Sequence, residues 1–126
     1  MKSLRLAIDF DDTIAVNAFP EIGELIDGAK EYINKLYDDG HTIMINTCRA
    51  GKEEGDAKKF LEDNGIKYHW LNCNRPEDIE HYKQDCRKMS ADVYIDDKNL
   101  LSLLYGMTIW REIYNIILYL SNKDNE

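Results

Sequence analysis

The chain has 126 residues, the size of one domain with a hydrophobic core of its own. Its formal net charge of -8 argues against strong binding of nucleic acid, because such binding depends on basic groups that meet phosphates. The apolar run before Ile8 is short and interrupted by Arg5, so neither a signal peptide nor a membrane span is predicted. The chain has three cysteines at no metal-ligand spacing, Cys48, Cys73 and Cys86, which indicates reduced thiols in a cytoplasmic protein. No membrane partner is expected.

The predicted elements alternate between strands and helices along the chain. Strands are expected at residues 4–8, 41–46, 66–71 and 93–95. Helices are expected from the apolar repeat that starts at Ile22 and ends at Gly40, around Ala57 to Leu61, from Pro76 to about Lys88, and from Ile109 to Leu120, with a frayed tail at 121–126. This order predicts a single α/β domain over residues 1–126, with a doubly wound parallel sheet between two layers of helices.

Two of the predicted strands end in pairs of carboxylates. Asp9 and Asp11 leave the first strand with similar orientation, so they would repel each other unless a proton or a divalent cation lay between them. Asp96 and Asp97 follow the last strand in the same way. Since α/β sheets bind ligands at the carboxyl ends of their central strands, these four acids predict a site for a hard metal ion.

The segment Asp9-Phe10-Asp11-Asp12-Thr13 resembles the DxDxT signature of the haloacid dehalogenase (HAD) superfamily of phosphotransferases. The other motifs of that family follow in order: a strand that ends in Thr47, a lysine matched by Lys88, and the pair Asp96-Asp97. The resemblance covers residues 4–99 and is strongest to small bacterial and phage hydrolases and capsule-biosynthesis phosphatases. It implies a HAD-like Rossmannoid fold without a cap domain. Asp12 departs from the pattern, because many members have Gly there.

The resemblance implies a Mg²⁺-dependent phosphomonoester hydrolase that works through an aspartyl-phosphate intermediate. Asp9 would be the nucleophile and Asp11 the general acid that protonates the leaving oxygen. Mg²⁺ would be bound by the side chains of Asp9 and Asp96, by the backbone carbonyl of Asp11, and by Asp97 through a water molecule.

Thr47 and Lys88 would bind the phosphate group. The threonine hydroxyl would donate a hydrogen bond to a phosphate oxygen, and the lysine would neutralise charge and orient Asp9. Lys83 is an alternative to Lys88, because both lie near the same predicted helix end.

Thr13 and Arg49 are expected to contact the substrate. Arg49 could clamp a phosphate with its two parallel donors, but an ion pair with Glu53 or Glu54 is an equally reasonable prediction.

The spacing of the motifs leaves no room for a cap domain. Only 33 residues lie between Thr13 and Thr47, and they hold one predicted helix and a loop. We therefore expect an open site, covered at most by the loop Ile14–Gly23, from which Asn17 and Phe19 could face the substrate. Such a site admits a phosphorylated small molecule or a phosphate on a larger substrate, or gains a lid from a neighbouring subunit of a homo-oligomer.

Two other classes of function fit part of the pattern. A phosphate-accepting receiver domain also uses an acidic pair, an accepting Asp, a Thr or Ser and a Lys, but its acidic pair follows the first strand and its accepting Asp comes later. The order here is the reverse. A HAD-like phosphotransferase, or a HAD-like module that binds without turnover, is the other alternative.

Overall fold

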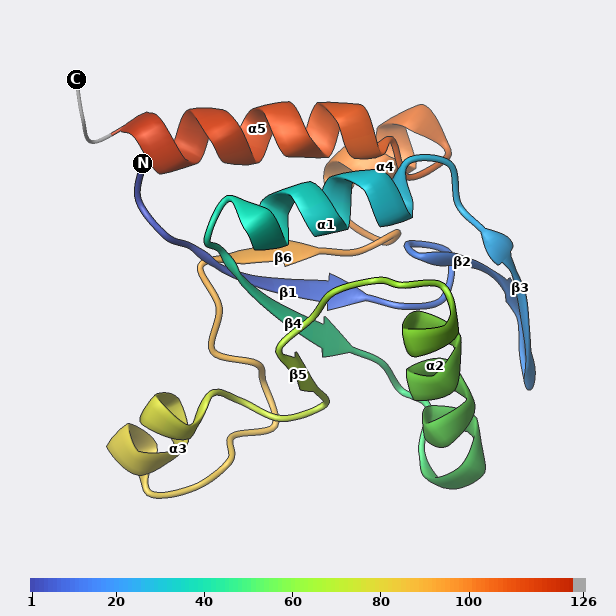
Figure 1. Ribbon diagram of the computed structural model, residues 1–126, viewed down its shortest axis with the longest axis horizontal. Helices are drawn as coiled ribbons and strands as arrows, with labels where there is room; N and C mark the ends of the chain where they lie inside the picture. The colour runs from blue at the N-terminus through green and yellow to red at the C-terminus, as the bar shows by residue number, and fades with distance from the viewer. Residues whose placement is uncertain (124–126) are drawn as a thin grey trace.

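The computed structural model describes residues 1–123 and contains a four-stranded parallel sheet flanked by helices (Figure 1). Strand β1 (Arg5–Asp9) lies between β4 (Thr42–Asn46) and β6 (Val93–Ile95), and β5 (Trp70–Leu71) lies beyond β4. The chain thus runs outward from β1 to β5 and then returns to the other side of β1. This reversal lies between β1 and β6, where ligands bind in sheets of this kind. The predicted α/β class and parallel sheet are confirmed.

Three helices cover the face of the sheet that carries Leu6 and Ile8. They are α1 (Ala29–Asp38), α2 (Gly51–Asp63) and α5 (Trp110–Asn122), and Figure 1 shows α1 and α5 running over this face. Their buried apolar side chains form one cluster with those of the strands. The amphipathic repeats that predicted these three helices therefore correspond to the faces that build the core.

The opposite face of the sheet is covered mainly by an irregular segment, residues 83–92. Met89 packs there against Ala7 of β1 and Met44 of β4. The prediction that this helix extends to about Lys88 is wrong, because α3 (Pro76–Tyr82) ends before Lys83. Lys83 adopts a left-handed backbone with φ 61°. The second layer is accordingly one short helix and this irregular segment.

A β-hairpin replaces the expected loop Ile14–Gly23 and the expected start of the first helix. Strands β2 (Ala15–Ala18) and β3 (Glu21–Leu25) pair antiparallel, and helix α1 begins only at Ala29. Ile22 and Leu25 lie in β3 and pack against the core, so their three-residue spacing imitated a helix. At Gly23 a Cβ atom would lie 2.4 Å from the Val16 carbonyl oxygen, so the close pairing requires glycine there.

Two further expectations are corrected. The third strand, expected over 66–71, is reduced to β5, and a short helix α4 (Leu100–Tyr105) was not predicted. The expected tail at 121–126 begins inside α5, and residues 124–126 lie outside the described part of the chain. Within residues 1–123, no helix has the length and apolar character needed to cross a membrane.

Candidate active site

Three carboxylates meet at the carboxyl ends of β1 and β6. Asp9 is the last residue of β1, and Asp96 and Asp97 directly follow β6. One oxygen atom from each of the three lies within 4.8 Å of the others. The two strands are neighbours and run parallel, so their ends bring three of the four predicted acids together. The fourth, Asp11, is not a member of this cluster, because its carboxylate pairs with Arg49. Three carboxylate oxygens at this spacing suit a hard cation such as Mg²⁺, which takes oxygen ligands and keeps several waters.

The electrostatics of Asp9 show how crowded these acids are. Partial burial of Asp9 raises its pKa to about 8, and the nearby charges of Asp96 and Asp97 add to the effect. Burial also raises the pKa of Asp96. Without a cation the cluster therefore retains a proton near neutral pH, which is the behaviour expected of acids whose charge is not neutralised.

Hydrogen bonds from α4 fix the loop that carries Asp96 and Asp97. The Ser102 hydroxyl donates to the carbonyl oxygen of Asp96 at 3.1 Å, and the Lys98 backbone N–H donates to its carboxylate at 2.9 Å. Asn99 caps the helix by accepting from the Ser102 N–H. Helix α4 thus holds the second half of the acidic cluster in place, a role that the sequence reasoning missed although Asn99 is a recognisable N-cap.

Thr13 is buried and supports Asp9 from beneath. Its hydroxyl donates to Asp9 Oδ2 at 3.3 Å, and its carbonyl accepts from the indole N–H of Trp110 at 2.8 Å. This differs from the expectation that Thr13 contacts the substrate, because its side chain has no exposed surface. The threonine orients the predicted nucleophile instead.

Arg49 forms a buried ion pair with Asp11. Two guanidinium nitrogens donate to the two Asp11 carboxylate oxygens at 2.9 and 2.8 Å, and the Arg49 side chain is only 1% exposed. The Arg49 guanidinium is therefore not exposed to a substrate in this structure. It also forms no ion pair with Glu53 or Glu54. Both Asp11 oxygens accept from Arg49, so this carboxyl cannot donate a proton while the pair persists.

Arg49 also holds the β2–β3 hairpin. Its guanidinium donates to the carbonyl oxygens of Pro20 and Glu21 at 2.9 and 2.7 Å, and lies 5.1 Å from the ring centre of Phe19. Phe19, which was expected to face the substrate, packs on Arg49 in this way and leaves more than half of its surface exposed. One arginine thereby joins the hairpin to Asp11.

Asp12 and Asn17 build the start of the hairpin. Asp12 adopts a left-handed backbone with φ 63°, a conformation that glycine tolerates best and that Asp and Asn tolerate better than most residues. Its carboxylate accepts from the Asn17 N–H at 2.9 Å. The Asn17 side chain accepts in turn from the Phe19 N–H. The extra carboxylate of Asp12 therefore serves the turn, and it is not a member of the acidic cluster.

Thr47 lies at the end of β4, next to the site, where its backbone is fixed by Asn72. The Thr47 N–H donates to Asn72 Oδ1 at 2.8 Å, while the Thr47 hydroxyl accepts from the Arg49 N–H at 3.1 Å. Asn72 itself has a left-handed φ of 55°. The hydroxyl hydrogen of Thr47 is thus free to point toward a ligand.

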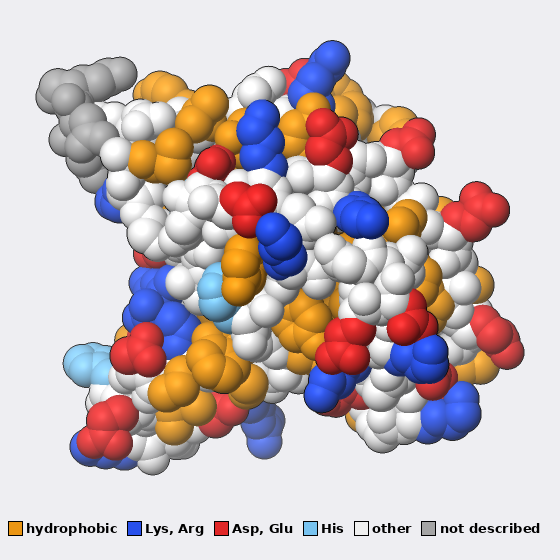
Figure 2. Space-filling view, viewed as in Figure 1, with side chains coloured by type: hydrophobic (Ala, Val, Ile, Leu, Met, Phe, Trp, Pro, Cys, Tyr) orange, Lys and Arg blue, Asp and Glu red, His pale blue; other side chains and the backbone are white. Residues whose placement is uncertain are grey.

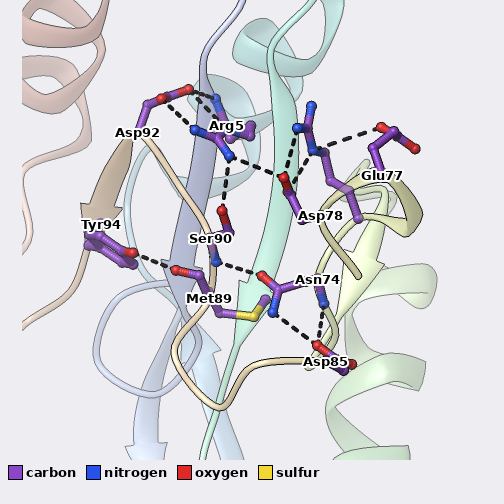
Figure 3. Close-up of polar contacts among 10 residues, drawn as sticks. Arg5, Asn74, Glu77, Asp78, Asp85, Met89, Ser90, Asp92 and Tyr94 are labelled. Atoms are coloured by element: carbon purple, nitrogen blue, oxygen red, sulfur yellow. Dashed lines mark hydrogen bonds and ion pairs between the residues drawn. The ribbon is translucent and has the colours of Figure 1, made fainter. Parts of the chain in front are cut away.

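Lys88 lies on the same face of the sheet as Asp9. Its Nζ lies 5.2 Å from the ring centre of Tyr94, whose hydroxyl donates to the Met89 carbonyl (Figure 3). Tyr94 lies in β6, and Asp96 directly follows this strand. Among the described residues Lys88 forms no ion pair, whereas the alternative Lys83 pairs with Glu80 on the surface of α3 at 2.6 Å.

A buried amide shapes the segment that carries Lys88. Asn74 is 3% exposed, accepts from the Ser90 N–H at 2.5 Å, and donates to Asp85 and to the Cys86 carbonyl at 2.9 and 3.0 Å (Figure 3). These bonds bend residues 83–92 into a loop and explain why α3 stops early.

Arg5 anchors the other end of the same segment. Its guanidinium pairs with Asp92 at 2.9 Å, donates to the Ser90 hydroxyl at 3.0 Å, and reaches Asp78 of α3 at 3.5 Å. Asp78 also pairs with Arg75 at 2.8 Å, and Figure 3 shows these groups as one network. Segment 83–92 is therefore held at both ends, although it has no regular secondary structure.

A cavity of about 450 Å³ lies beside Asp97, between the hairpin and α4. Asp12, Asp97 and Lys98 give it polar walls, and its apolar walls come from both elements: Val16, Ile26, Leu103 and Met107. Lys98 Nζ lies 3.4 Å from Asp97 and is largely exposed. The space is large enough for a small phosphorylated molecule next to the acidic cluster.

No protein-family model matches this chain, and no curated protein matches it. A solved structure of a conserved protein from Bacteroides thetaiotaomicron is similar, with a TM-score of 0.79 and 29% sequence identity over 99% of this chain and 93% of that chain. The likeness supports the α/β fold over almost the whole length of the sequence.

Proposed function

We propose that this chain is a Mg²⁺-dependent phosphomonoester hydrolase of the HAD type, with Asp9 as its nucleophile. The observation that carries the proposal is the cluster of Asp9, Asp96 and Asp97 at the switch point between β1 and β6. The raised pKa of Asp9 supports a cation there, because three carboxylates this close repel one another until positive charge is added. Mg²⁺ would be held by Asp9, Asp96, Asp97 and the Asp11 carbonyl, and would supply charge neutralisation of the phosphate.

Each step of the proposed reaction has a group that can perform it. An Asp9 oxygen attacks phosphorus and the bond to the leaving oxygen breaks, which gives an aspartyl-phosphate. Water then attacks phosphorus, and the bond to Asp9 breaks to release phosphate. The leaving oxygen takes up a proton in the first step, and the water loses one in the second. Asp11 is the group assigned to both transfers, which require that its ion pair with Arg49 first separate.

Thr47 and Lys88 are assigned to the phosphate group itself. The Thr47 hydroxyl retains its hydrogen for a phosphate oxygen, because the bond that it makes in this structure is one that it accepts. Lys88 has a long side chain whose Nζ lies over the Tyr94 ring, and among residues 1–123 it forms no ion pair. A charge-assisted bond from each would hold the phosphate against Asp9.

A second candidate is a HAD-like module that binds Mg²⁺ and phosphate without turnover. The Arg49–Asp11 pair favours it, because both oxygens of the predicted general acid are engaged. The two candidates share the metal and the phosphate, and differ in whether a phosphoryl group is transferred to Asp9.

Phosphate release distinguishes the two candidates. We expect the wild-type protein with Mg²⁺ to release phosphate from aryl phosphates and from members of a panel of phosphorylated metabolites, and Asp9→Asn to lose at least ~10³-fold in rate. Asp11→Asn should keep Mg²⁺ and phosphate binding but turn over slowly. The matched control is Asp63→Asn on the exposed surface of α2.

Measuring ligand binding together with turnover distinguishes the hydrolase from the binding module. The binding module is favoured if calorimetry detects binding of Mg²⁺ and phosphate but no substrate releases phosphate. In that case the mass spectrum of acid-quenched protein should also show no phosphoryl adduct on Asp9. Full activity of Asp9→Asn would exclude the hydrolase mechanism altogether.

A further inference from the structure

Helix α4 carries its apolar side chains on the outside of the molecule. Of the residues in its sequence, Leu-Leu-Ser-Leu-Leu-Tyr, the one that is buried is Ser102. Leu100 is 88% exposed and Leu104 79% exposed, and Met107 just after the helix is 62% exposed. Leu101 is partly buried and packs against the core. Leucine at the exposure of Leu100 is common for single residues, but three exposed leucines on one short helix form a larger apolar surface.

We define the α4 patch as the exposed apolar residues of α4 and their neighbours, which are Leu100, Leu103, Leu104, Tyr105, Met107 and Ile116. Five of them belong to α4 or directly follow it, and Ile116 of α5 lines a groove of about 380 Å³ along β6 together with Leu100. Leu103 and Met107 also line the cavity beside Asp97. Figure 2 shows apolar side chains along the upper edge of the molecule, over α4 and α5.

The size of the patch exceeds that of an ordinary monomer surface. With about 150–200 Å² for each fully exposed side chain of this kind, the exposures amount to roughly 700 Å². The largest apolar patch of a typical monomer is about 300–600 Å², and each partner of a stable complex buries about 800 Å². The α4 patch therefore matches one side of a standard protein interface.

The charge pattern indicates what covers it. Residues 99–110 contain no charged side chain, in a chain of which 32% of the residues are charged. Two copies of a protein with net charge -8 repel each other unless they meet through an uncharged surface. The surface over α2, in contrast, is a mixture of acidic and basic side chains, with ion pairs such as Lys59–Asp63 (Figure 2).

We infer that the α4 patch binds a second copy of this chain, which gives a two-fold symmetric dimer. In such a dimer each patch covers the other, so the apolar side chains of both leave water together, and residues 99–110 bring no charged side chain into the contact. The edge of β6 that is not paired with β1 lies along the same groove and is covered by the same contact. A membrane surface is the less favoured partner, because an anionic bilayer repels a protein of net charge -8, and the basic side chains next to residues 99–110 are Lys98 and Arg111, fewer than the clusters that bind anionic lipids.

The test is the molecular mass in solution, measured by sedimentation velocity over a concentration series. Wild-type protein should be dimeric at about 10–100 μM. Leu104→Glu and Tyr105→Glu should each weaken dimerisation at least ~10-fold, because two-fold symmetry places both copies of the new charge in the contact. Tyr82→Glu is the matched control, since Tyr82 on α3 is 53% exposed and Tyr105 is 48% exposed; this variant should keep the wild-type mass.

The result does not depend on catalysis, so it stands or falls separately from the proposed hydrolase. Circular dichroism of each variant shows that it is folded before its mass is measured. Wild-type protein that stays monomeric at about 100 μM, or patch variants that dimerise as the wild type does, would overturn the inference. So would growth beyond the dimer, which indicates a contact that does not close, and so would flotation of monomeric protein with phosphatidylcholine vesicles, which would assign the patch to a membrane.

Discussion

The acidic cluster makes a quantitative prediction about stability without metal. Asp9 has a pKa of about 8 in the folded protein and an ordinary value of 3.8 when unfolded, so the folded state binds a proton more tightly. The contribution of Asp9 to the free energy of unfolding therefore falls as the pH rises from about 4 to about 8 and is constant above that. The full difference would correspond to roughly 6 kcal/mol at a dry site, but Asp9 is only partly buried, and solvent screening leaves about 1–3 kcal/mol.

Asp9→Asn removes this effect, since an amide carries no charge at any pH. In EDTA the variant should be more stable than the wild type by about 1–3 kcal/mol at pH 8, a Tm difference of about 4–10 °C, and the difference should be small near pH 4. Thermal unfolding of both proteins from pH 4 to pH 8 measures it, and Glu62→Gln on the exposed surface of α2 should show no such trend. Mg²⁺ should raise the Tm of the wild type and not that of Asp9→Asn. A variant less stable than the wild type at pH 8 without metal would refute the reasoning.

The remaining predictions concern the groups around the cluster. Arg49→Ala should lower the free energy of unfolding in urea by about 3–5 kcal/mol, because it leaves Asp11 and two hairpin carbonyls without their donor; an equal loss in an Asp11→Ala background would contradict this. Lys88→Ala should lower kcat/KM by about tenfold to hundredfold and Lys83→Ala by much less, and steady-state kinetics with the reverse order would show that Lys83 is the phosphate ligand. Asn74→Ala should cost about 1–3 kcal/mol of stability and also lower kcat, because segment 83–92 loses its buried amide; unchanged kcat in the folded variant would exclude a role in positioning Lys88.

The sheet could be predicted from the sequence because its strands are short apolar runs buried on both faces. Strands β1, β4 and β6 begin and end within about one residue of their predicted limits. Strands β1 and β4 each bury three consecutive apolar residues, which is typical of a central parallel strand. The hairpin could not be predicted, because the three-residue spacing of Ile22 and Leu25 is typical of a helix although both residues lie in β3 and pack against the core. The end of α3 was missed for a different reason. It depends on hydrogen bonds from Asn74 to residues more than ten positions away, and no local signal marks them.

The acidic cluster was predictable for a topological reason. A parallel sheet brings the carboxyl ends of neighbouring strands together, so carboxylates that follow two strands have to meet once the strands are adjacent. No comparable topological rule predicts which acid pairs with Arg49. Asp11 lies 38 positions earlier in the sequence, and Glu53 and Glu54, which are nearer, lie in the first turn of α2. All three acids are half-buried, so burial does not distinguish them, and the partner of Arg49 depends on the tertiary packing of its guanidinium against Asp11 and the hairpin.

The geometry of Arg49 also links two parts of the site that the sequence treats as separate. The same guanidinium binds the Asp11 carboxylate and the carbonyls of Pro20 and Glu21, so Asp11 cannot turn toward a leaving group without loss of bonds that also hold the hairpin. Any reaction that uses Asp11 as a proton donor must first separate this pair. Asp11→Asn keeps the shape of the side chain but removes its charge, whereas Arg49→Ala frees the carboxylate and loosens the hairpin. If Asp11 is a proton donor, only the first change removes the proton itself, and the pH dependence of kcat in the two variants reveals the difference.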